Sequence, residues 1–275
     1  MSYEKAVSGH YTHGGLLEAI EASLIKMGKT SETITIPELS AVDEFHIGGR
    51  IATDHLLEKL NFSSQDNLLD IGCGLGGACR YIANKHGNNV SGIDLTQEYI
   101  DVGNTLSSWV GLENKVDLVQ GSALDLPFED ESFSGAIMLH VGMNIEDKNH
   151  LFSEVFRVLQ PGASFGIYDV MQISNGEIIY PVPWASDPST SQLASISQYQ
   201  QALNRAGFSI EKEEHRTDFA LEFFKRLGAK AKTTNGPPPL GLHTLMQETT
   251  TTKLTNMVSN IKQNLIAPIE MIGRK

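Results

Sequence analysis

Short apolar runs alternate with amphipathic stretches along the chain from about residue 66 onward. The apolar runs have the length of buried strands and cover 68–71, 90–95, 116–121, 135–140 and 164–170. Between them, helical spacing of apolar residues marks 77–86, 97–108 and 148–159. Strands that alternate with helices predict an α/β fold, in which helices flank both faces of a mostly parallel sheet.

The pattern continues less regularly toward the C-terminus. It predicts helices over 197–206, 219–231 and 251–264, and further strands over 208–217 and 268–274. We therefore expect a seven-stranded sheet. No repeat of fixed period and no low-complexity linker divides the chain, so we expect one structural domain.

Residues 1–60 do not follow this alternation. Apolar positions 16, 17, 20, 24 and 25 predict an amphipathic helix over 15–27. A second helix is predicted over 50–60, with Ile51, His55, Leu56 and Leu60 facing inward. We interpret 1–60 as an N-terminal helical lid and 61–275 as the core.

Two irregular segments, about 172–196 and 232–249, are rich in proline and glycine. Connections of this length inside a compact domain are usually functional lids or disordered. We predict that both segments form caps over the site.

Composition and charge narrow the classes of partner that the protein is expected to bind. The chain has 275 residues and a net charge of −12, which argues against nucleic acid and against an anionic membrane surface. No apolar segment approaches the ~20 residues of a membrane-spanning helix, and the first residues lack a secretory signal. Cys73 and Cys79 are too few for a disulfide framework or a zinc site. We expect a cytoplasmic protein with a small-molecule ligand.

The stretch NLLDIGCGLGG, residues 67–77, is the clearest chemical signal. A glycine loop between a strand and a helix presents backbone N–H groups to a ligand. Gly72, Gly74 and Gly77 satisfy the G-x-G-x-x-G pattern of a dinucleotide site, but the loop also reads as D-x-G-x-G. The carboxylate of Asp70 would repel a pyrophosphate and would suit a ligand with ammonium and sulfonium groups.

Asp94 ends the second predicted strand, where its carboxylate can accept hydrogen bonds from two ribose hydroxyls. A dinucleotide and a nucleoside with ammonium and sulfonium groups both contain such a ribose. Asp94 therefore indicates a nucleoside ligand without deciding between the two. Its alternative role is to cap the helix that follows.

Two further motifs decide between the cofactors. EVFRVLQPGASFGIYDV (154–170) and ALDLPFEDESFSGAIM (123–138) follow the glycine loop in order. The three together resemble the class I S-adenosylmethionine-dependent methyltransferases, which implies a Rossmann-like fold. YTHGGLLEAIEASLIKMGK, DEFHIGG, PVPWASDPS and GPPPLGLHTLM are similar to a small-molecule subgroup with sarcosine/dimethylglycine and, more distantly, phosphoethanolamine methyltransferases.

The resemblance implies methyl transfer from S-adenosylmethionine, with S-adenosylhomocysteine as product, to an amine or amino-acid nitrogen. Transfer to carbon or oxygen of an apolar acceptor is the alternative, because ALDLPFEDESF is shared with ubiquinone/menaquinone methyltransferases. An apolar pocket lined by cap residues would favour that alternative, whereas an arginine and an aromatic wall would favour the amine. A non-catalytic S-adenosylmethionine-binding module is the third interpretation.

When the family's motifs are matched to this sequence position by position, the resemblance implies which residues bind the cofactor. Asp70, Gly72, Gly74 and Gly76 would surround the methionine part, and Asp94 would bind the ribose. Leu95, Ser122 and Ala123 would contact the adenine, with a hydroxyl at Ser122 where many relatives have Asp. His140 ends the fourth strand, where cofactor and acceptor would meet; the alternative is a hydrogen-bonded strand-end residue.

VDEFHIGG (42–49) is the candidate gate, with Asp43, Phe45 and Gly48 toward the substrate. His46 would be a base or would orient the acceptor, since imidazole titrates near pH 6.5. The alternative is a capped loop with solvated charges. Metal ligation is not expected, because the spacing of the acidic and histidine residues fits no zinc pattern.

Trp184 in the cap at 180–189 could attract a methylated ammonium through its indole face, or it could anchor the loop. Met143 would line the substrate site or fill the core. Arg50 could pair with a substrate carboxylate, or it could be an ordinary surface residue. The segment 236–246 could form a cap or a contact in a homodimer.

Overall fold

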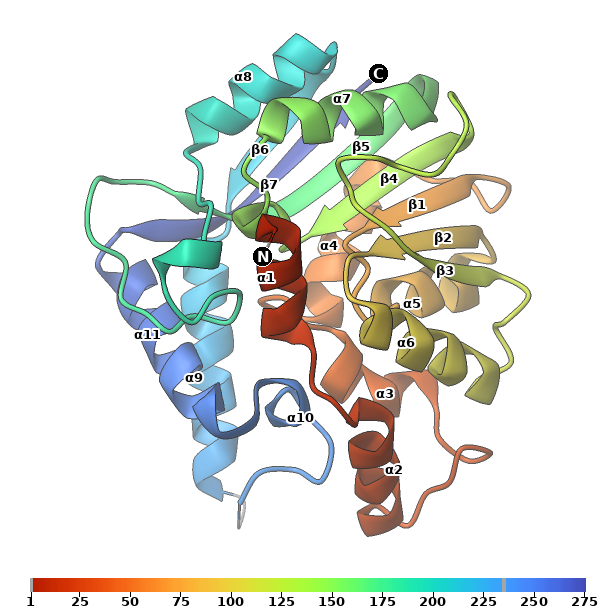
Figure 1. Cartoon of the computed structure of the whole chain (residues 1–275), viewed down its shortest axis with the longest axis vertical. Coiled ribbons are helices and arrows are strands. Elements are labelled where there is room, and N and C mark those ends of the chain that lie inside the picture. The colour runs from red at the N-terminus through yellow and green to blue at the C-terminus, as the bar shows by residue number, and fades with distance from the viewer. Residues whose placement is uncertain (1, 234–235) are drawn as a thin grey trace.

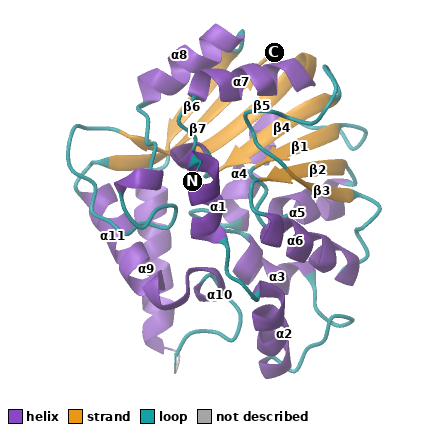
Figure 2. Ribbon diagram, viewed as in Figure 1, coloured by secondary structure: helices purple, strands orange, loops and turns teal. Residues whose placement is uncertain are grey.

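Seven strands form a single sheet in the order β3-β2-β1-β4-β5-β7-β6 (Figure 2). The computed structural model describes residues 2–233 and 236–275. Strands β1 to β5 are parallel, and β7 runs antiparallel between β5 and β6. The strands are β1 (Asn67–Ile71), β2 (Asn89–Asp94), β3 (Val116–Gln120), β4 (Phe133–Leu139), β5 (Leu159–Gln172), β6 (Ser209–His215) and β7 (Ile266–Arg274).

Two hydrophobic cores lie on opposite faces of the sheet, because neighbouring strand residues point to opposite sides. Leu68 joins the core under α4 (Arg50–Leu60) and α5 (Gly77–His86), the face to which α6 (Gln97–Trp109) also contributes. Leu69 joins the core under α7 (Lys148–Val158) and α8 (Ile196–Ala206). The predicted mostly parallel, helix-flanked sheet is confirmed.

The remaining helices gather near the carboxyl ends of the parallel strands (Figure 1). They are α1 (Tyr3–Tyr11), α2 (Leu16–Lys26), α3 (Ile36–Asp43), α9 (Thr217–Thr233), α10 (His243–Met246) and α11 (Thr250–Lys262), with short turns η1 (Gly142–Asn144), η2 (Pro188–Thr190) and η3 (Gln247–Thr249). None of the helices within the described residues is long and apolar enough to cross a membrane.

Several sequence expectations need correction. The helices α1, α3 and α10 were not predicted. Ile51 is 63% exposed, so it does not face inward as expected. Strand β5 begins at Leu159, earlier than the strand predicted over 164–170. Residues 160–163, which include Pro161 and Gly162, loop out between its two paired stretches.

Candidate functional site

A cavity of about 340 Å³ opens at the carboxyl edge of the sheet. Its wall comes from the glycine loop, the ends of β2 and β4, the segment after β3, helix α1 and the loop after α3. The predicted site residues that line it are Asp43, Phe45, His46, Asp70, Gly72, Gly74, Asp94, Leu95, Ser122, Ala123 and His140.

The glycine loop is held by its backbone geometry. Gly72 has a φ of +69°, and a side chain there would collide with Val141. Gly76 precedes α5 with a φ of +74°, but it packs against Leu118 and Arg80 and does not line the cavity. The expected cofactor contact at Gly76 is therefore not supported, since its role is to let the helix begin close to β3.

Asp94 caps the start of the helix that follows, and its carboxylate also lies at the cavity. Its Oδ2 accepts a hydrogen bond from the Gly74 N–H at 2.9 Å, and Oδ1 accepts from the Thr96 N–H at 2.8 Å at the start of α6. The carboxylate still lines the cavity. These backbone bonds fix its orientation toward any ligand there.

The cavity is acidic. Its wall contains the carboxyl groups of Glu4, Asp43, Asp70, Asp94, Glu146 and Asp147, and no lysine or arginine among the described residues. Asp70 is buried and accepts a hydrogen bond from the Cys79 thiol at 3.2 Å. Burial raises the pKa of Asp70 to about 7 and also raises the pKa of Asp94. Such a wall favours a cationic ligand and disfavours a pyrophosphate.

A smaller pocket of about 60 Å³ adjoins the cavity, and Tyr11, Phe45, His46 and His140 line both. Its other walls are the predicted substrate residues Met143 and Trp184, the β5 residue Val170 and Ile47 of the loop after α3. The two caps, α9 and α11 contribute the remaining side chains, namely Pro183, Phe223, Phe224, Leu227, Leu242, Leu254 and Met257. No charged side chain belongs to this lining within the part of the chain that the structure describes. We call it the apolar pocket.

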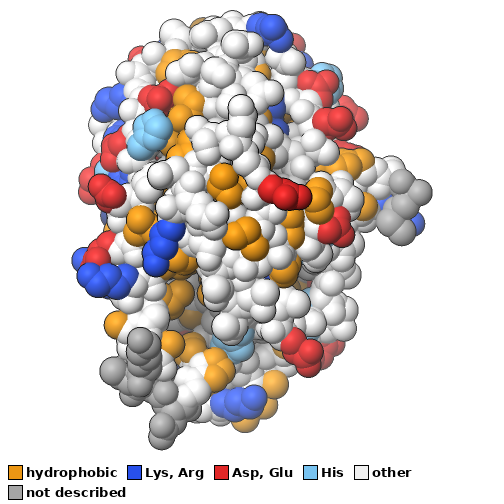
Figure 3. Space-filling view, turned by 90° about the vertical axis from the view of Figure 1, so that its left-hand side faces the viewer, with side chains coloured by type: hydrophobic (Ala, Val, Ile, Leu, Met, Phe, Trp, Pro, Cys, Tyr) orange, Lys and Arg blue, Asp and Glu red, His pale blue; other side chains and the backbone are white. Residues whose placement is uncertain are grey.

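Hydrophobic side chains are also visible on the surface of the molecule that corresponds to the left-hand side of Figure 1. In Figure 3 they lie across the middle of this face and border a hollow in its lower half, while charged side chains lie mostly toward the edges.

Both caps contribute to these pockets. Pro183 and Trp184 come from 172–196, and Trp184 is fixed because its Nε1–H donates to Ser191 Oγ at 2.9 Å. The second cap includes residues 234 and 235, which lie outside the described residues. From its described part, Leu242 reaches the apolar pocket and Leu245 reaches the cavity.

Three residues that were expected near the substrate have other contacts in the structure. Gly48 lies in neither lining, because it packs against Phe219. Arg50 pairs with Glu44 at 3.2 Å and stacks on Tyr81, so it is not free for a substrate carboxylate. Asp43 lines the cavity, not the apolar pocket, and forms an ion pair of 2.7 Å with buried Arg80.

The two predicted histidines face each other across the junction of the pockets, with ring centroids 6.1 Å apart. The Ile47 N–H donates to His140 Nδ1 at 3.2 Å, and His46 Nε2 lies 3.0 Å from the Gly49 carbonyl oxygen. Burial lowers the pKa of His46 to about 4 and the pKa of His140 well below its usual value. Both rings are therefore neutral near pH 7.

Sequence reasoning missed helix α1, which contributes Tyr3, Glu4, Val7 and Tyr11 to the cavity. The signal was present, because Tyr3, Val7 and Tyr11 follow helical spacing and Ser2 is an N-cap residue. The same wall joins Glu4 to Ser122 Oγ through a hydrogen bond of 2.5 Å.

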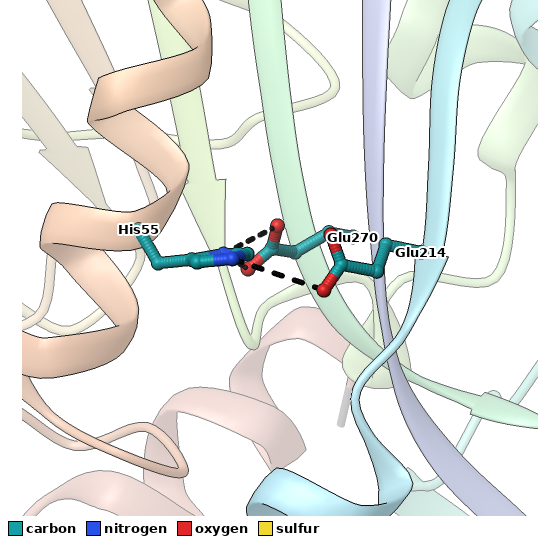
Figure 4. Close-up of side chains that lie close together, drawn as sticks. All are labelled: His55, Glu214 and Glu270. Atoms are coloured by element: carbon teal, nitrogen blue, oxygen red, sulfur yellow. Dashed lines mark hydrogen bonds and ion pairs between the residues drawn. The ribbon is translucent and has the colours of Figure 1, made fainter.

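A separate cluster brings together His55 of α4, Glu214 of β6 and Glu270 of β7 (Figure 4). These groups have ligand atoms within 4.8 Å of one another, a spacing that a metal ion would accept. However, Lys59 pairs with both carboxylates, and Arg216 contacts all three side chains. We interpret the cluster as an ion-pair network that fastens α4 to the antiparallel edge of the sheet.

Comparison with known proteins identifies the domain. Residues 69–167 match the family described as a methyltransferase domain. The chain is 30% identical over 145 residues to ajmaline N-methyltransferase of Rauvolfia serpentina, covering 53% of the chain and 45% of that protein. It is 31% identical over 179 residues to phosphoethanolamine N-methyltransferase 1 of Zea mays, covering 65% and 35%.

The chain spans about a third to a half of the length of the curated relatives it matches. Among solved structures, geranyl diphosphate C-methyltransferase from Streptomyces coelicolor A3(2) superposes with a TM-score of 0.72 at 16% identity, covering 100% and 98% of the two chains. Residues 69–167 are therefore similar to a methyltransferase domain, and the chain has the fold of the class I S-adenosylmethionine-dependent methyltransferases.

Proposed function

We propose that this protein transfers a methyl group from S-adenosylmethionine to an apolar small-molecule acceptor. One observation supports this most strongly: an acidic cavity for a cationic cofactor meets an apolar pocket at a shared wall that contains His46 and His140.

The order of groups along the sheet edge fits the cofactor. Asp70, Gly72 and Gly74 would bind its amino-acid part at β1, and Asp94 its ribose at β2. Leu95, Ser122 and Ala123 would hold the adenine near β3. S-adenosylmethionine carries a net positive charge and its product is neutral, so an acidic wall favours the methyl donor over the product.

The apolar pocket favours the second of the two acceptor classes expected from the sequence. A small amino acid such as sarcosine would need a cation for its carboxylate, and Arg50 is engaged by Glu44. Among the described residues, the pocket offers aromatic and aliphatic walls without a charge to replace it. An acceptor that is apolar around its reacting atom would bury well here.

Methyl transfer is an in-line displacement in which the cofactor supplies the reactive methyl group. The protein has to align the acceptor and exclude water, and alignment alone can contribute roughly 7–11 kcal/mol. We assign exclusion of water to α1 and the N-terminal lid together with the two caps, and alignment to Phe45, Met143 and Trp184.

The test is formation of S-adenosylhomocysteine when purified protein receives S-adenosylmethionine and either the organic-soluble or the water-soluble fraction of a metabolite extract. We expect product with the organic-soluble fraction. Leu254→Arg, which places a charge in the apolar pocket, should abolish turnover and leave cofactor binding by calorimetry unchanged. Thr251→Arg, at an exposed position of the same helix, is the matched control. Turnover with the water-soluble fraction alone would contradict the proposed acceptor class.

A further inference from the structure

A continuous chain of side chains leads away from the junction of the two pockets. His46 Nε2 lies 3.0 Å from Thr53 Oγ1, and Thr53 Oγ1 lies 3.2 Å from Glu44 Oε2. All three residues are buried. The connection therefore links the shared wall of the pockets to a buried carboxyl group.

The partners fix the direction of each hydrogen bond. The Gly49 carbonyl oxygen can only accept, so His46 Nε2 carries the hydrogen. Thr53 then accepts from His46 and donates its own hydrogen to Glu44. In the neutral ring, Nδ1 of His46 is left with a lone pair, and it has no hydrogen-bond partner among the described residues.

His140 has the complementary arrangement. Its Nδ1 accepts from the Ile47 N–H, so in the neutral ring its Nε2 carries the hydrogen. This Nε2 is buried and has no partner within the part of the chain that the structure describes. The wall shared by the two pockets therefore offers one lone pair and one N–H donor.

Several charged groups surround the hydrogen-bonded side chains of His46, Thr53 and Glu44, which we call the relay. Burial raises the pKa of Glu44 to about 7, and Asp43 raises it further, whereas Arg50 and Thr53 oppose the shift. His46 faces His140 and Tyr168, whose ring lies edge-on to it. A carboxyl group with this pKa can take up and release a proton near neutral pH.

We propose that the acceptor presents a hydroxyl group to this wall, with His46 as the base and with Thr53 and Glu44 as positioning residues that carry its proton away. This inference rests on the proposed methyl transfer and names the reacting group. An apolar alcohol, phenol or enol has the two properties needed: an oxygen that accepts from His140 Nε2–H, and a proton that His46 Nδ1 can remove.

The step balances in atoms and charge. The hydroxyl proton moves to His46 Nδ1, the Nε2 proton to Thr53 Oγ1, and the threonine proton to Glu44 Oε2. An oxygen electron pair forms the new bond to the methyl carbon, and the carbon–sulfur pair stays on sulfur. The cationic donor and anionic Glu44 become a neutral thioether and a neutral carboxyl group. After the product leaves, the proton returns from Glu44 through Thr53 to His46 Nε2, and the Nδ1 proton leaves to solvent, which restores the starting state.

Other acceptors use this wall less well. A tertiary amine that arrives as the free base has no proton for His46 to remove, and an alkene carbon has no lone pair to accept from His140. With such acceptors, no proton would pass from the acceptor through His46 and Thr53 to Glu44. The chemical shift of the transferred methyl group distinguishes these cases directly, because methyl groups on oxygen, nitrogen and carbon resonate in separate ranges.

The experiment uses ¹³C-methyl S-adenosylmethionine and the organic-soluble extract, with single-turnover rates measured against pH. We expect an O-methyl product and a rate that rises with pH and levels off above about pH 7. Thr53→Val and Glu44→Gln should lower the rate at neutral pH by about 10²-fold or more. Thr53→Ser, which keeps the hydroxyl, should recover most of the rate, and exposed Glu113→Gln should match the wild type.

A readout independent of turnover is the ¹⁵N NMR spectrum of the histidine side chains, in which His46 and His140 should both be neutral Nε2–H tautomers. An Nδ1–H tautomer at His46, an N-methyl product, or equal rates for Thr53→Val and Thr53→Ser would overturn the relay while leaving methyl transfer intact. Failure of the wild type to transfer any label would overturn the proposed function and the relay together.

Discussion

At the scale of single residues, the site is built from groups whose burial is unfavourable for folding. Asp70 is 2% exposed, and its partner is only a thiol. A carboxylate in such surroundings is destabilised until a cationic ligand arrives. We therefore expect Asp70 to favour cofactor binding at the expense of the stability of the ligand-free protein.

Asp70→Asn tests this balance. Because burial raises the pKa of Asp70 from 3.8 to about 7, the folded state holds a proton that the unfolded state releases. Stability therefore falls as the pH rises between these values. We expect the variant to have a higher Tm than the wild type at about pH 8 and no advantage below about pH 4, measured by calorimetry without ligand.

The same variant should bind S-adenosylmethionine at least about tenfold more weakly, which corresponds to ~1.4 kcal/mol. Exposed Asp117→Asn is the control, since it removes a carboxylate of β3 that lines neither pocket. Equal affinity together with unchanged Tm would show that Asp70 is not paired with the cation.

Several residues of the cavity wall could be predicted from the sequence because they lie at the ends of strands. Asp70, Gly72 and Gly74 sit in one continuous motif, and Asp94 ends the next strand. The partners of Arg50 and Asp43 could not be predicted in this way. They depend on how the loop after α3 approaches α4 and α5, which no local pattern encodes.

At the scale of elements, helix α1 is weakly attached to the rest of the protein. Only Val7 is buried within it, and its ties are side-chain contacts such as Tyr3 to the Thr190 carbonyl at 3.2 Å and Tyr11 to Asn144 at 2.8 Å. It leads into Gly14 and Gly15, which both have positive φ. An element with few buried contacts opens readily.

Glu98 fastens the connection between α1 and α2. Its carboxylate accepts hydrogen bonds from the backbone N–H groups of 13–16, including Gly15 at 2.8 Å and Leu16 at 3.0 Å. These bonds lower its pKa to about 2 against the opposing effect of burial. The carboxylate of Glu98 therefore stays charged down to low pH, and at neutral pH it holds the backbone of residues 13–16 in place.

Glu98→Gln should free α1, because an amide offers one acceptor oxygen where the carboxylate offers two. We expect faster tryptic cleavage after exposed Lys5, with S-adenosylmethionine restoring much of the protection. The control is Asp101→Asn, at an exposed position of α6, the helix that also carries Glu98. Unchanged cleavage in the Glu98 variant would mean that α1 is held by its own contacts and not through this connection.

Element prediction succeeded where the pattern was long and failed where it was short. Predicted helices 77–86 and 50–60 match α5 and α4 residue for residue. Helices α3 and α10 span eight and four residues, too few for apolar periodicity to be distinguished from a loop.

At the scale of the whole molecule, the fold followed from the order of strands and helices, but the apolar pocket did not. Its walls come from β5, the two caps, α9 and α11, whose lining residues run from Val170 to Met257, and from α1 and the loop after α3, which lie more than a hundred residues before β5 along the chain. The choice between an amine and an apolar acceptor depended on this assembly. Sequence reasoning favoured the amine because four segments outside the cofactor motifs are similar to sarcosine/dimethylglycine methyltransferases.

The most direct test of the central claim is where the methyl group goes. Purified protein is incubated with methyl-tritiated S-adenosylmethionine and a complete metabolite extract, and label is then partitioned between water, organic solvent and precipitated protein. We predict that enzyme-dependent label enters the organic phase. Enzyme-dependent label that remains in water in a new amine or amino-acid product would contradict an apolar acceptor, and label that is never transferred would contradict the methyltransferase function itself.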